Sequence, residues 1–216
     1  DTTLVLWDVE SGTPIRRMQH PNNAETRGVV ILPGDQQALS TGANPDIIRW
    51  DLNSGQPIDR LRGHRGTVYS VAVSADGTRV LSSGDDNTVI EWDLQRGAPI
   101  TFLRGHGGYI RQAVFSADGT HALSASADKT VRVWDLDNGA EQLRLTSADQ
   151  VNTISLSTDT KVLATGSDDG VAWLWDLASG KPTGSYNWHE RDVKSVAISP
   201  DGKYLLTGGG KRDGAL

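Results

Sequence analysis

Residues 79–97 read RVLSSGDDNTVIEWDLQRG, and this stretch holds the pattern that decides the fold. Two short runs rich in Val, Ile, Ser and Thr flank the polar turn GDDN. The second run ends in a Trp-Asp pair, after which a second polar turn closes at Gly97. Short β-branched runs separated by such turns predict antiparallel hairpins.

The Trp-Asp pair recurs along the whole chain at an almost constant spacing. Successive pairs lie 43, 42, 42 and 41 residues apart, at Trp7-Asp8, Trp50-Asp51, Trp92-Asp93, Trp134-Asp135 and Trp175-Asp176. Each pair follows a β-branched run and precedes a polar turn that ends in Gly (DVESG, DLNSG, DLQRG, DLDNG, DLASG). Every full repeat divides into four strand-like runs. One four-stranded sheet cannot bury its faces alone, so the repeats are predicted to stack on one another.

This period, the Trp-Asp pairs and the Gly-His pairs at Gly63-His64 and Gly105-His106 resemble the WD-repeat β-propeller family, in the regular style of prokaryotic repeats. The resemblance covers the whole chain. It implies an all-β propeller built from four-stranded antiparallel blades, with about five blades' worth present. Because the chain starts and stops at matching phases of the repeat, we expect it to be cut from a larger propeller of about seven blades. A closed five-blade ring is the alternative.

The chain is therefore expected to be one propeller region over residues 1–216. We predict a half blade at 1–20, blade 2 at 21–62, blade 3 at 63–104, blade 4 at 105–146, blade 5 at 147–187 and a half blade at 188–216.

A Ser-His-Asp set in blade 4 has two interpretations. It could be a catalytic triad, but in the family that the chain resembles these positions form a buried structural network with the Trp of the third strand. Recurrence favours the structural interpretation, since an active site is normally built once and a packing device is built in every blade. The predicted members are His106, Ser126, Asp128 and Trp134 in blade 4, His64, Asp86 and Trp92 in blade 3, and Ser167, Asp169 and Trp175 in blade 5.

The predicted network is incomplete in several blades. Gly84 stands at the Ser position of blade 3, Ala148 at the His position of blade 5, and Asn44 at the Asp position of blade 2. The last half blade keeps His189 but has a longer turn. Blades 2 and 5 and this half blade are therefore expected to be the less stable ones.

Composition narrows the class of function. Lys and Arg number 21 against 27 Asp and Glu, which gives a net charge of −6 and disfavours a nucleic-acid partner. The chain has no Cys, and its His residues lack metal-ligand spacing, so no cofactor and no metal site are predicted. The longest apolar runs are far too short to insert in a membrane. The compartment is left open, with the cytoplasm favoured.

The resemblance implies that a protein or peptide partner docks on the propeller face near the entrance of the central channel. That face is formed by the starts of the first strands and by the turns between the second and third strands. Tyr and Arg are enriched in binding hot spots, although they could also simply cover the rim. Trp188 joins the set because an aromatic stands where the motif has Gly. The candidates are Arg27, Thr67, Tyr69, Asp85, Tyr109, Arg111, Asn152, Asp168, Trp188 and Lys194.

These observations predict a non-catalytic scaffold for protein–protein interaction. One alternative is the sensor or regulatory arm of a larger multidomain signalling protein, such as a kinase or a nucleotide-switch ATPase. A remote alternative is an enzyme with its site in the central funnel, but the predicted first strands supply mainly apolar and small residues there.

Overall fold

The computed structural model describes residues 2–210, and over this range the chain is built from antiparallel β-sheets and a single 3₁₀ turn. Blade 2 consists of β3 (Thr26–Ile31), β4 (Gln37–Gly42), β5 (Asn44–Asp51) and β6 (Pro57–Arg62). Blade 3 consists of β7 (Val68–Val73), β8 (Arg79–Gly84), β9 (Thr88–Asp93) and β10 (Ala98–Arg104).

The next two sheets repeat this arrangement. Blade 4 consists of β11 (Ile110–Phe115), β12 (His121–Ser126), β13 (Thr130–Asp135) and β14 (Glu141–Thr146), and blade 5 of β15 (Val151–Leu156), β16 (Val162–Ser167), β17 (Ala172–Asp176) and β18 (Lys181–Tyr186). Two-stranded sheets stand before and after them, formed by β1 (Thr3–Trp7) with β2 (Pro14–Gln19) and by β19 (Val193–Ile198) with β20 (Leu205–Gly209). The 3₁₀ turn η1 (Pro21–Asn23) leads into β3.

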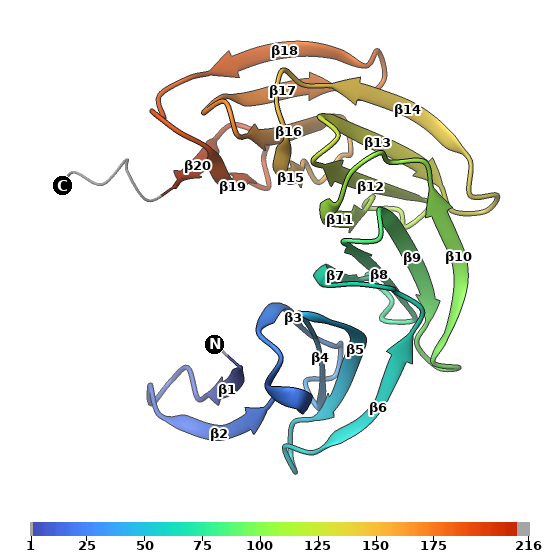
Figure 1. The fold of residues 1–216 in the computed structure, drawn as a ribbon. Helices are drawn as coiled ribbons and strands as arrows, with labels where there is room; N and C mark the ends of the chain where they lie inside the picture. The colour runs from blue at the N-terminus through green and yellow to red at the C-terminus, as the bar shows by residue number, and fades with distance from the viewer. Residues whose placement is uncertain (1, 211–216) are drawn as a thin grey trace.

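The six sheets follow an arc around a common centre, and in each four-stranded sheet the first strand is innermost and the fourth outermost (Figure 1). The core lies between neighbouring sheets. Trp92 and Val80 of blade 3, for example, share one buried cluster with Leu39 and Ile47 of blade 2. The prediction of an all-β propeller of four-stranded antiparallel blades is confirmed, and each sheet buries its apolar face only because the next sheet covers it.

The repeated Asp-Gly and Trp-Asp motifs fix the hairpins. In blade 3 the carboxylate of Asp76 accepts the Ser74 hydroxyl at 2.6 Å and the backbone N–H of Thr78 at 3.0 Å. The Asp of the Trp-Asp pair holds a later turn of blade 3 in the same way: Asp93 Oδ1 accepts the backbone N–H of Arg96 at 2.8 Å. Gly97 follows at a φ of +64°, which glycine adopts without strain.

No helix within residues 2–210 is long and apolar enough to cross a membrane. The longer turn predicted in the last half blade runs over residues 208–214, and its part from residue 211 onward lies outside the described residues.

Candidate interaction site

Every innermost strand carries one β-bulge, and it falls at the same position each time. In β7, for example, the pairing with β8 shifts between Val68 and Ser70, so the residue between them has no partner on the second strand. A bulge turns the side chain of the extra residue away from the regular pleat. The five bulge residues are Arg27, Tyr69, Arg111, Asn152 and Lys194.

All five bulge residues are among the sequence-predicted binding candidates, and three of them carry a positive charge. Arg27 pairs with Glu25 at 2.8 Å, and the Lys194 ammonium lies 2.5 Å from Asp192 and 3.7 Å from Asp168. Asn152 donates from Nδ2 to Asp168 Oδ1 at 2.7 Å. The last two blades thus share a compact polar cluster around the Asp168 carboxylate.

The structure brings Tyr69, Tyr109 and Arg111 together across blades 3 and 4. The two tyrosine ring centroids lie 5.8 Å apart. The Arg111 guanidinium lies 4.8 Å from the ring centroid of Tyr109 and 5.6 Å from that of Tyr69, within the range of a cation–π contact. Its Nη2 donates to the Tyr109 hydroxyl at 3.2 Å, and that hydroxyl donates to Gln150 Oε1 of the following blade at 2.8 Å. We call these three residues the Tyr-Arg cluster.

The remaining candidates lie in two places. Asp85 is next to the Tyr-Arg cluster, because its Oδ1 is 3.5 Å from the Tyr69 hydroxyl, and its backbone N–H bonds the carbonyl of Thr67. Trp188 is 93% exposed and lines a separate groove with Leu174, Tyr186 and Tyr204. The structure therefore does not bring Trp188 together with Tyr69 and Tyr109.

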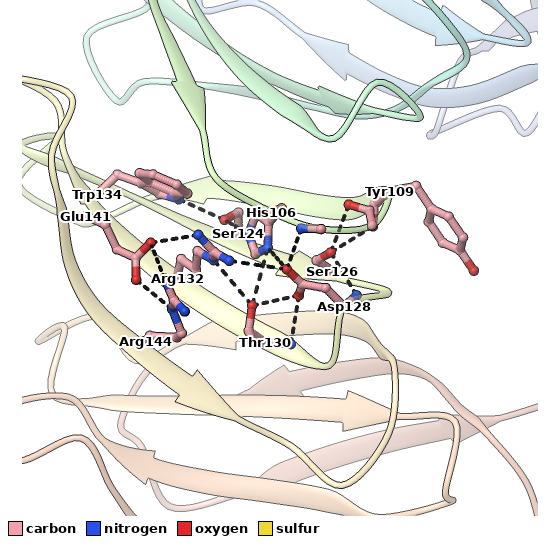
Figure 2. Close-up of polar contacts among 12 residues, drawn as sticks. His106, Tyr109, Ser124, Ser126, Asp128, Thr130, Arg132, Trp134, Glu141 and Arg144 are labelled. Carbon is pink, nitrogen blue, oxygen red and sulfur yellow. Dashed lines mark hydrogen bonds and ion pairs between the residues drawn. The ribbon is translucent and has the colours of Figure 1, made fainter.

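Behind this face, blade 4 holds a buried polar network (Figure 2). His106 Nδ1 lies 2.8 Å from Asp128 Oδ2, and His106 Nε2 lies 2.8 Å from Ser124 Oγ. The same Ser124 oxygen accepts the indole N–H of Trp134 at 2.8 Å. Asp128 also accepts the backbone N–H of Gly107 and the hydroxyl of Thr130. These bonds fasten the entry loop, the second strand and the third strand to one another.

The sequence-based assignment of Ser126 as the serine bonded to His106 is wrong, because Ser124 takes that place. The two serines lie two residues apart on β12 and share a face of the strand, so the sequence pattern fits either. Ser126 has a different role: its hydroxyl lies 3.0 Å from the Gly108 carbonyl and accepts the Asp128 backbone N–H at 3.1 Å.

In blade 3 the serine also lies two residues earlier than the sequence analysis placed it, and the polar network of this blade is complete. Gly84 does not stand at the serine position, because Ser82 Oγ bonds both His64 Nε2 at 2.7 Å and the Trp92 indole at 2.8 Å. A Cβ on Gly84 would lie 2.6 Å from the Thr67 carbonyl oxygen, so close backbone contact requires glycine there.

Blade 5 is corrected in the same way. The Trp175 indole donates to Thr165 at 3.0 Å, and Ser167 bonds the turn residue Asp169 at 2.5 Å without contributing to the indole bond.

His20 is a buried residue that the sequence analysis missed. Its ring is fully buried and lies 6.4 Å from the ring of Trp50, which is the place of His64 relative to Trp92 in blade 3. Neither ring nitrogen has a hydrogen-bond partner among the described residues. The available signal was a His 30 residues before the Trp, where blades 3 and 4 have 28, with the extra residues taken up by η1.

Burial shifts the pKa of two of these imidazoles, those of His106 and His20. Burial lowers the pKa of His106 below its usual value, although the Asp128 carboxylate opposes this change. Burial also lowers the pKa of His20. In Asp128, burial favours the neutral acid, but the bonds from Thr130, Gly107 and His106 outweigh it and hold the pKa well below the usual range. His106 is therefore a neutral ring beside a charged carboxylate.

We expect the His106 ring to titrate in the folded protein with a midpoint below about 6.5, the usual value for histidine. A histidine that is neutral when folded binds more protons when unfolded. Its contribution to stability is thus present above pH 6.5 and falls as the pH drops below that value. NMR titration of the ring signals measures the midpoint, and the same ring in urea serves as the control. A folded midpoint above 6.5 would show that the Asp128 charge outweighs burial.

Within residues 2–210, no group of three or more His, Asp or Glu side chains is placed to hold a metal ion. The polar side chains of the buried networks in blades 3 and 4 are instead joined to one another by hydrogen bonds. Of the five bulge residues, Arg27 and Lys194 are exposed, Tyr69 and Arg111 are half-buried, and Asn152 is buried.

The sequence matches the family described as WD domain, G-beta repeat, over residues 55–93, 97–135, 141–176 and 180–216. Among known proteins, it is 43% identical over 61 residues to WD repeat-containing protein 55 of Bos taurus, covering 28% of this chain and 15% of that protein. It is 51% identical over 43 residues to ribosome assembly protein 4 of Chaetomium thermophilum, covering 20% of this chain and 8% of that protein. A Lissencephaly-1 homolog of Heterostelium pallidum is 43% identical over 47 residues, covering 22% and 11%. The matched segments thus span only a small part of these relatives.

Proposed function

Because the chain belongs to the WD domain, G-beta repeat family, we propose that it is a non-catalytic scaffold whose protein or peptide partner binds over the Tyr-Arg cluster. Proteins of this family generally act as scaffolds for interactions between proteins. The observation that carries the proposal is the β-bulge in each innermost strand, which directs five side chains away from the pleat without disturbing the core.

The chemistry of the cluster suits a protein partner. Tyr and Arg supply large contact areas and several hydrogen-bond donors, and their side chains are already ordered by contacts with each other. Ordered side chains lose less conformational entropy on binding, which favours affinity. Asp168 and Lys194, 3.7 Å apart, extend the polar surface over the last two sheets, and the buried Asn152 donates to Asp168 beneath them.

The buried network supports a structural role for the Ser-His-Asp set. The His106 side chain is fully buried, and Ser124 is fully buried and already accepts the Trp134 indole, so a substrate has no access to that hydroxyl. The same four-residue arrangement occurs in blade 3 with His64, Ser82, Asp86 and Trp92. A network that recurs in two blades is expected if it stabilises each blade, whereas an active site needs to be built only once.

We expect simultaneous replacement of Tyr69, Tyr109 and Arg111 by alanine to weaken partner binding at least tenfold, as expected for the loss of hot-spot residues. The fold should persist, because all three side chains lie outside the buried clusters. Affinity capture with the intact propeller, followed by titration of the captured partner, measures the effect. Alanine at Phe102 and Arg104, an aromatic and cationic pair on the outermost strand β10, is the matched control. Unchanged binding by the triple variant would place the site elsewhere.

A further inference from the structure

We propose that Arg111 binds an Asp or Glu side chain of the partner, so that the bound segment is a peptide with one acidic residue at a fixed position. The inference rests on the proposed function and specifies the chemistry of its partner. It concerns the Tyr-Arg cluster, and three features of that cluster support it in turn.

The first feature is that the guanidinium is held in place before any partner arrives. Tyr69 comes from β7, and Tyr109 directly precedes β11, so the two rings fix Arg111 from neighbouring blades. The Tyr109 hydroxyl is itself anchored on Gln150 of blade 5. A planar cation held against two aromatic faces presents its donors in a fixed direction, which suits recognition of a planar carboxylate.

The second feature is that this charge has no partner of opposite sign. Among residues 2–210, no carboxylate lies within 4.0 Å of Arg111, whereas the other two cationic bulge residues, Arg27 and Lys194, both have one. Arg111 Nε is buried and has no hydrogen-bond acceptor, and Nη2 donates only to a neutral hydroxyl. A partly buried guanidinium gains more from a carboxylate than a fully solvated one does, because the local dielectric constant is lower.

The third feature is the placement of the surrounding acids. Asp85 precedes the turn of blade 3 and lies near the hydroxyl of Tyr69, but the equivalent residue of blade 4 is Ala127. The space over Arg111 on its own blade therefore carries no competing carboxylate. Asp85 is the carboxylate beside the cluster, and its charge would repel a polyanion such as a nucleic-acid backbone. One carboxylate on an otherwise apolar or neutral segment fits this charge pattern.

The test is selection of peptides from a random nonapeptide display library with the intact protein. We expect the selected peptides to carry Asp or Glu at one fixed position. We also expect Arg111→Gln to abolish this preference and Arg111→Glu to replace it with Lys or Arg. In a synthetic copy of a selected peptide, Glu→Gln should weaken binding about tenfold to the native protein and less than twofold to Arg111→Gln, as expected if that side chain contacts Arg111.

Two controls keep the outcomes distinct. Arg104→Gln removes a cation that lies over an aromatic ring on the outer strand β10, and it should select the same peptides as the native protein. Asp85→Asn removes the nearest repelling charge and should tighten binding of the acidic peptide two- to threefold even if Arg111→Gln folds poorly.

Selected peptides that need Tyr69 and Tyr109 but show no acidic preference would overturn the inference and leave the proposed function intact. If amidation of the peptide's C-terminus abolishes binding and Glu→Gln does not, the bound group is a chain terminus and the inference is wrong. Failure to select any peptide that depends on the two tyrosines would contradict both the inference and the proposed function.

Discussion

Replacing Asp128 by alanine is expected to lower the free energy of unfolding by about 3 kcal/mol, the range found when one partner of a buried charged network is removed. The carboxylate accepts from His106 at 2.8 Å, from the Gly107 backbone at 2.9 Å and from Thr130 through both its backbone and its hydroxyl. Arg132 lies 3.4 Å away and is almost fully buried. Alanine would remove the acceptor of the His106, Gly107 and Thr130 donors, whereas Arg132 would keep its bond to Glu141 at 2.7 Å.

Urea unfolding followed by tryptophan fluorescence measures the loss, and hydrogen exchange locates it. Location is needed because stacked repeats can unfold one at a time, which breaks two-state behaviour. The greatest loss of protection is expected in β11 to β13. Asp118→Ala is the matched control: Asp118 also caps a turn of blade 4 but is exposed, so about 1 kcal/mol or less is expected. A change below about 0.5 kcal/mol for Asp128→Ala, the level of an ordinary surface substitution, would contradict the structural role.

The sequence alone predicted the fold correctly because the same motifs recur in every blade. Each Trp-Asp pair marks a third strand, and each Asp-Gly-like turn marks a hairpin, so one ambiguous stretch is corrected by the others. The Trp residues at positions 50, 92 and 134 are almost fully buried, as the packing of one sheet on the next requires. Neighbouring sheets meet through these side chains, which is why a period of about 42 residues determines the architecture.

The polar network was harder to predict because strand periodicity leaves a two-residue ambiguity. Ser124 and Ser126 both point to the same face of β12, and only the position of the His106 ring distinguishes them. In blade 2 the problem was a loop of different length. The turn η1 changes the distance between His20 and Trp50, so a search at fixed spacing does not find the histidine.

For the candidate binding residues, the sequence predicted the positions along the chain but not the backbone geometry. The repeat placed five of them at the start of the first strands, but it did not predict the bulge that turns their side chains from the pleat. It also did not predict their burial, since Arg27 and Lys194 are exposed whereas Asn152 is buried. Whether Arg111 pairs with Asp85 or packs on Tyr69 and Tyr109 likewise depends on distances between blades, which a repeat pattern does not give.

Core and surface are divided between adjacent residues of the same strand. Ile110 is fully buried between blades 3 and 4, and the next residue, Arg111, is the bulge residue of the Tyr-Arg cluster. Ile110, fixed in the core, therefore also fixes the position of Arg111 on the same strand. As a result, variants of the bulge residues should change binding with little effect on stability, and variants of the buried residues should do the reverse.

The largest loss of stability is expected for Trp92→Ala, at about 4 kcal/mol, which is the cost of emptying a large buried aromatic site. Trp92 is fully buried and packs in one cluster with Leu39, Ile47 and Ile90 from two blades. Its indole N–H also donates to Ser82, which bonds His64. The substitution thus removes packing between blades 2 and 3 and one bond of the network of blade 3.

Hydrogen exchange should show the loss of protection in β4 to β9, since each of these strands contributes a buried residue to the cluster, while blade 5 keeps its protection. Trp188→Ala makes the same chemical change at a side chain that is 93% exposed, so it should alter the free energy of unfolding by less than about 0.5 kcal/mol. Similar losses for the two variants would mean that Trp92 is not packed between the sheets. A large loss for Trp92→Ala that spreads evenly over all the sheets would instead mean that the array unfolds as one cooperative unit, because coupling between neighbouring blades would then exceed the stability of any single blade.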